Sequence, residues 1–89
     1  MHRANAYAAL SEELATWRRR PKAELAARVG QPAAEREVKI GGEVVKIEIT
    51  ASWANREQTA VRLHAVAYGP SHWRMEQLAE DATVALGAK

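Results

Sequence analysis

The sequence contains no cysteine among its 89 residues. Disulfide bonds, thiolate metal ligands and a cysteine nucleophile are therefore excluded. The absence of cysteine also fits a reducing compartment, so we expect the protein to be cytoplasmic. No apolar run approaches the roughly 20 residues that a membrane helix requires, and the N-terminal segment lacks the apolar core of a signal peptide. We therefore expect neither a membrane segment nor a secretion signal.

The net charge is also small. The chain has 13 lysines and arginines and 11 acidic residues, which leaves a net charge of +2. Any binding of a polyanion must therefore come from a local cluster of cations rather than from the field of the whole molecule. Apolar residues make up 47% of the chain and charged residues 27%, which is an ordinary globular mixture. We expect one small domain that spans residues 1–89.

The N-terminal segment has the pattern of an amphipathic helix. Large apolar residues recur at spacings of three, four and three, at Tyr7, Leu10, Leu14 and Trp17. This stripe is narrow, so we expect the helix to dock on a flat surface. Pro21 ends the helix, because it lacks a backbone N–H. A second, short helix is expected over residues 22–29, with Gly30 as its C-terminal cap.

The period of the pattern then changes from helix to strand. "EREVKIGGEVVKIEITASW" predicts two strands joined by a two-residue turn at Gly41-Gly42. This turn sets Val38 opposite Val45 and Glu37 opposite Lys46. "TAVRLHAVAY" alternates again and predicts a third antiparallel strand. One face of this sheet is expected to carry the apolar residues Val38, Ile40, Val45, Ile47, Ile49, Trp53, Val61, Leu63, Ala65 and Ala67.

The segment after Gly69-Pro70 admits two interpretations. Ser71 can cap a helix, and an apolar stripe then follows at Met75, Leu78, Ala79, Ala82 and Leu86. "HWRMEQL", residues 72–78, can instead form a short fourth strand. We favour the helix. The expected fold class is α+β, with an N-terminal helix, a short second helix, a three-stranded antiparallel meander and a C-terminal helix.

Several short motifs occur in a fixed order: "ELAARVGQP", "GGEVVKIEITASW", "AVRLHAVAYGPSHWR" and "LAEDATV". Over residues 22–84 this order resembles a family of small uncharacterised bacterial proteins, with an E-L-x-x-x-x-G segment, a strand ending near a Trp, and a later Trp-Arg pair. The chain departs from that pattern at "ANREQ", where the family has an acidic cluster, and between Trp73 and Leu78, where it is one residue shorter and lacks a proline. The resemblance implies a bacterial source and no known activity.

The most basic stretch surrounds Pro21 and comprises Arg18, Arg19, Arg20 and Lys22. Consecutive residues step about 100° around a helix, so the three arginines spread around its axis. Cations in a last helical turn also favour the helix dipole, by about 0.3–1 kcal/mol each. We interpret the arginines as the end of a helix. Contact with an anionic partner, a nucleic acid or an acidic protein, is the alternative.

The outward face of the sheet is expected to present Lys46, Arg62, His64 and Tyr68. A protein that binds single-stranded nucleic acid places several aromatic rings on such a face, and one tyrosine is too few. Trp53 points inward by the alternation of the strand. His64, expected opposite Thr50, is interpreted as a surface or interface histidine.

No set of residues has the spacing of a catalytic or metal site. The histidines His2, His64 and His72 are scattered, whereas a zinc site needs three or four converging ligands. Glu80 and Asp81 are neighbours on the expected helix and would point about 100° apart. The sequence has no nucleophile-elbow motif and no glycine-rich phosphate loop. We therefore predict no enzymatic activity, no metal and no cofactor.

An interaction domain is the function that remains. A sheet covered on one face leaves its other face and an edge strand exposed, and self-association would enlarge a small core. We expect a cytoplasmic protein-interaction or adaptor domain that forms a homodimer, with no membrane partner. Weak binding of nucleic acid or an acidic partner through residues 18–22 is the alternative. The spacing of Trp17, Trp53 and Trp73 leaves open whether they share a core or line a pocket.

Overall fold

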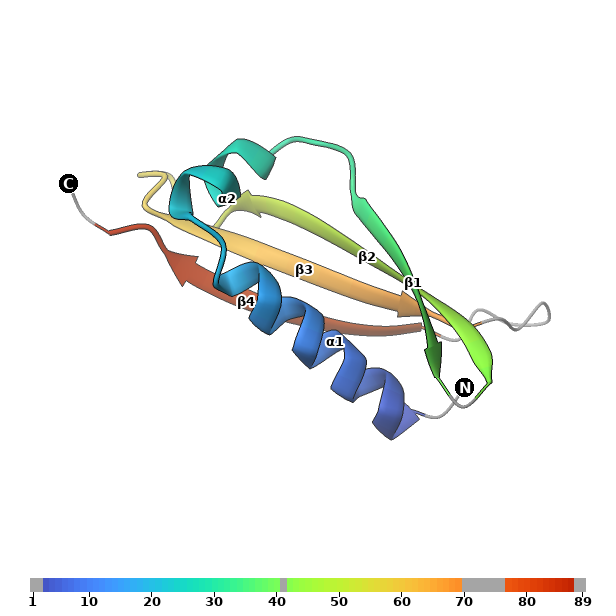
Figure 1. Ribbon diagram of the computed structural model, residues 1–89. Coiled ribbons are helices and arrows are strands. Elements are labelled where there is room, and N and C mark those ends of the chain that lie inside the picture. Colours follow the sequence, from blue (N-terminus) through green and yellow to red (C-terminus); the bar gives the residue numbers. More distant parts are fainter. Residues whose placement is uncertain (1–2, 41, 70–76, 88–89) are drawn as a thin grey trace.

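Two helices precede a four-stranded sheet in the computed structural model, which describes residues 3–40, 42–69 and 77–87. The elements in chain order are α1 (Arg3–Arg18), α2 (Lys22–Arg28), β1 (Ala34–Ile40), β2 (Glu43–Trp53), β3 (Ala60–Tyr68) and β4 (Gln77–Ala85). Each strand pairs antiparallel with the next, in the order β1-β2-β3-β4. Both helices lie on one face of this sheet, so the fold is α+β (Figure 1).

The prediction of a three-stranded sheet followed by a C-terminal helix is wrong. Residues 77–85 form β4, which pairs with β3 along its whole length from Tyr68↔Gln77 to Ala60↔Ala85. The alternative strand at 72–78 overlaps β4 only at its last two residues, and residues 70–76 lie outside the described part of the chain. β3 is the most buried strand, so its backbone groups need a partner on each side, and β4 supplies the second one.

The boundaries of the helices agree with the sequence to within a residue or two. α1 ends at Arg18, just before Pro21, and α2 ends at Arg28, with the following Gly30 at a φ of +82°. Leu10, Leu14 and Trp17 are buried as expected. Tyr7 is 42% exposed, and Ala6 is buried in its place, which narrows the apolar stripe further.

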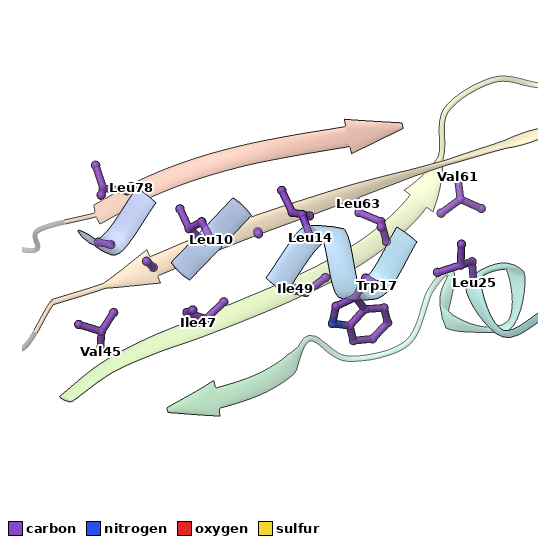
Figure 2. Packing of buried hydrophobic residues seen from close by; sticks show 13 residues of the cluster. Leu10, Leu14, Trp17, Leu25, Val45, Ile47, Ile49, Val61, Leu63 and Leu78 are labelled. Atoms are coloured by element: carbon purple, nitrogen blue, oxygen red, sulfur yellow. The ribbon is translucent and has the colours of Figure 1, made fainter. Parts of the chain in front are cut away.

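The core lies between the helices and one face of the sheet. The register of the first hairpin is confirmed, with Val38 opposite Val45 and Glu37 opposite Lys46. Figure 2 shows α1 side chains facing side chains of β2 and β3. The buried cluster comprises Ala6, Leu10, Leu14, Trp17, Leu25, Val45, Ile47, Ile49, Val61, Leu63, Ala65, Ala67 and Leu78.

The helices cover the sheet unevenly. α1 packs against β4 and β3, and α2 packs against β2 (Figure 1). The fully buried alanines Ala65 and Ala67 allow α1 to approach β3 closely. β1 lies on the far side of the sheet from β4, so the helical layer does not extend over it as it does over β3 and β4. This offset leaves a groove between α1 and β1.

The docking of α1 is expected to depend on Leu10, which is fully buried in the core. Leu10→Ala should lower the free energy of unfolding by about 2–5 kcal/mol, because it removes apolar contacts and leaves a cavity. Urea denaturation followed by circular dichroism measures this loss. The control is Val44→Ala, because Val44 is 45% exposed. A loss at Leu10 no larger than that of the control would contradict the packing described.

Candidate functional site

A groove runs between α1 and the edge strand β1. Its larger part has a volume of about 440 Å³ and is bounded by α1 on one side and by Arg36 and Val38 of β1 on the other. The α1 wall consists of Ala9, Glu12, Glu13, Ala15, Thr16 and Arg19. A second hollow of about 260 Å³ lies toward the start of β1, between Trp17, Arg20 and Ala34, and also touches Ile47 and Ile49 of β2. We call the two together the α1–β1 groove.

An ion pair crosses this groove at the point where its two parts meet. The Nη1 atom of Arg36, on the helix-facing side of β1, lies 3.0 Å from Oε1 of Glu13 on α1. The other carboxylate oxygen of Glu13 accepts a hydrogen bond from Nε1 of Trp17, at 3.3 Å. Glu13 therefore ties the edge strand to the helix and orients the indole ring.

Trp17 closes the groove at the C-terminal end of α1. The guanidinium of Arg20 lies 3.9 Å from the centroid of the indole ring, and that of Arg28 lies 5.7 Å from it. Such cation–π contacts contribute about 0.5–2 kcal/mol each. Arg20 also approaches Glu24, four residues later, at 3.7 Å. Arg20 is therefore occupied within the chain itself.

The four basic residues singled out in the sequence do not converge. Arg18 is exposed, Arg19 lines the α1–β1 groove, and Arg20 stacks on Trp17. The Nζ atom of Lys22 approaches Gly87 at the other end of the described chain. The cations therefore face different neighbours, as their helical spacing indicated.

The edge of β1 is the open side of the sheet next to the groove. Lys46 lies opposite Glu37, as expected, but its Nζ atom instead lies 3.6 Å from Glu35. Within the described residues, Glu37 and Lys39 make no ion pair, and both side chains are exposed. An isolated parallel bridge between Val29 and Ala51 covers the neighbouring part of β2, so the free edge begins at β1 itself.

A second polar cluster lies on the outer face of the sheet, away from the helices. The Nη2 atom of Arg62 lies 2.7 Å from Oδ2 of Asp81, and Nδ1 of His64 contacts the other carboxylate oxygen. Sequence reasoning missed this cluster, because it placed Asp81 on a helix. Thr50 lies opposite His64, as expected. No hydrogen bond joins Thr50 to His64 in the described structure, and the cluster is exposed. The Thr50 hydroxyl therefore lacks the contacts that would activate it as a nucleophile.

The remaining outer-face candidates lie at the other end of the sheet. Lys46 and Tyr68 border an open hollow of about 500 Å³, together with Glu37, Val44, Glu48 and Gly69. The predicted outer-face set is therefore divided between this hollow and the cluster around Asp81. Trp53 is partly buried against the core, while Trp73 lies outside the described residues, so a meeting of the three indoles is not among the observed contacts.

In residues 3–40, 42–69 and 77–87, no group of three histidine, aspartate or glutamate side chains is arranged to hold a metal ion. Over the same residues, no helix has the length and apolar character needed to cross a membrane.

The carboxyl of Asp81 is expected to link stability to pH. Hydrogen bonds from Arg62 and then His64 hold the pKa of Asp81 below its ordinary value of 3.8. The ionised form therefore stabilises the fold above about pH 4, and this contribution is lost as pH falls through the lowered pKa. Asp81→Asn should cost about 0.5–1 kcal/mol at pH 5, because the pair is exposed, and less at pH 3.

Urea unfolding at the two pH values measures this difference. Glu57→Gln, in the exposed loop before β3, serves as the control for removing a carboxylate. An Asp81→Asn effect that is the same at both pH values would contradict the assignment.

Comparisons of the chain with protein-family models, with curated proteins and with solved structures give no match. The resemblance to a family of small bacterial proteins therefore stays a prediction.

Proposed function

We propose that the protein is a protein-interaction domain that binds an extended segment of a partner along the free edge of β1. The observation that carries this proposal is the coincidence of an open strand edge with a groove beside it. Edge strands next to a helix-lined groove bind peptides by strand addition, in which main-chain hydrogen bonds supply affinity and the groove selects side chains. Both features follow from the displacement of α1 toward β4.

β1 suits strand addition better than β4, the other edge of the sheet. α1 packs directly against β4, and both hollows on the helix side of the sheet include residues of β1. An added strand at β1 would place every second side chain beside Val38, which lines the groove. Apolar residues at those positions would extend the core.

The charges along the groove define the chemistry of the partner segment. Glu12 lies near the end of β1 marked by Val38, whereas Arg19 lies farther along α1, whose C-terminal end borders Ala34 at the beginning of β1. A segment that runs antiparallel to β1 meets Glu12 first and Arg19 later. The complementary segment therefore carries a basic residue early, alternating apolar residues in its middle and an acidic residue late.

A polyanion fits this site poorly. Glu12 and Glu13 line the same wall as Arg19, so a phosphate backbone would meet like charges along the groove. We propose a binding role rather than a catalytic one, because the Asp81 cluster is exposed and its neighbouring hydroxyl is not hydrogen-bonded to His64.

The test uses an acetylated, amidated peptide, Lys-Thr-Val-Thr-Val-Thr-Glu, whose charged and apolar side chains share one face of the strand, and the same peptide with its terminal Lys and Glu exchanged. We expect the first to bind about fivefold more tightly, because two partly exposed ion pairs replace two repulsive contacts. NMR titration of labelled protein measures both affinities. The amides of β1 that face the free edge should also exchange more slowly with solvent when the peptide is bound.

The double variant Glu12→Arg with Arg19→Glu is expected to reverse the preference between the peptides. The matched control is Arg56→Glu with Glu57→Arg, which exchanges charges in the exposed loop before β3. Slower exchange at β4 instead of β1, or an unchanged preference in the groove variant, would overturn the proposal.

A further inference from the structure

We infer that the partner segment is β1 of a second copy of this chain, paired antiparallel about a two-fold axis at Val38. This inference rests on the proposed function, because it uses the same strand edge, and it names the partner. The two sheets would join into one continuous antiparallel sheet with β1 strands at its centre. Because each chain has one β1, the pairing is isologous and closes as a dimer.

The outer face of β1 supplies the charge complementarity for this pairing. In the register centred on Val38, Glu37 lies opposite Lys39 of the second copy, and Lys39 lies opposite its Glu37. Both side chains are exposed, and neither makes an ion pair within the described chain. Lys39 faces Val44 on β2, and Lys46, which faces Glu37, is engaged by Glu35. The second copy therefore offers opposite charges where β2 leaves them unused.

The helix-facing side of β1 fits the same register. Val38 is half-buried and lines the α1–β1 groove. The two-fold axis sets Val38 opposite Val38 of the second copy. In a single copy this side chain faces the groove, whereas in the dimer the two valines would contact each other.

Other registers that keep the same faces together are worse. If the axis passes through Glu37, two glutamates lie opposite each other. If it passes through Arg36, two arginines lie opposite each other. A β4–β4 pairing lacks charge complementarity altogether, because the charged residues of β4, Glu80 and Asp81, are both acidic. Among these registers, the pairing at Val38 is the one that matches opposite charges on both sides of the axis without setting two like charges on the axis itself.

The test is a pair of charge reversals, Glu37→Lys and Lys39→Glu. Each alone sets like charges opposite each other at two symmetric positions and should weaken the dimer at least about tenfold. When the two variants are mixed, every position again carries opposite charges, so a heterodimer with near-wild-type affinity is expected. Native mass spectrometry resolves the species by mass, and sedimentation velocity gives the affinities.

The matched controls are Glu57→Lys and Arg56→Glu, which make similar charge reversals in the exposed loop before β3 and should dimerise like the wild type. Circular dichroism verifies that all variants fold. Dimers that are unaffected by either reversal, or a mixture that yields no heterodimer, would overturn the inference. A monomeric wild type whose β1 amides are still protected by the peptide would overturn it too, while leaving the proposed function standing. A monomeric wild type whose β1 amides are not protected by the peptide either would reject the β1 site altogether.

Discussion

The narrow apolar stripe of α1 determines how much of the sheet is covered, and the rest of the molecule follows from that limit. Ala6, Leu10, Leu14 and Trp17 are the buried residues of α1, which packs against β3 and β4, while Tyr7 stays largely exposed. A helix with so narrow a contact surface cannot also cover β1. The sheet therefore keeps an open strand beside a groove, and Arg36 with Glu13 spans the distance between helix and strand.

The same offset separates the polar groups of the protein into two environments. On the helix side, Glu13 joins Arg36 to Trp17, so the charged residues of the groove are also part of its structure. On the outer face, Asp81 gathers Arg62 and His64 from the neighbouring strand. The first environment is concave and borders the free edge of β1, whereas the second is exposed. The proposed binding role uses the first of these environments.

Local patterning predicts most of the fold but not the site. The alternation of apolar residues along β1 and β2 determines their register, because a slip by one residue would expose Ile47 and Ile49. β4 was missed because Leu78, Ala79 and Ala82 satisfy a helical period, while the alternation of Ala82, Val84 and Leu86 and the β-branched Thr83 also fit a strand. The groove depends on where α1 lies across the sheet, and only tertiary packing decides that. The contact of Asp81 with His64 was hidden by the same wrong assignment of β4.

The central claim is that the free edge of β1 is completed by β1 of a second copy of the chain. NMR hydrogen exchange on the unmodified protein, at dilute and at high concentration, tests it most directly. The account predicts that the β1 amides facing the free edge exchange more slowly as concentration rises, while those of β4 do not change. Concentration-dependent protection at β4, or none at β1, would contradict it.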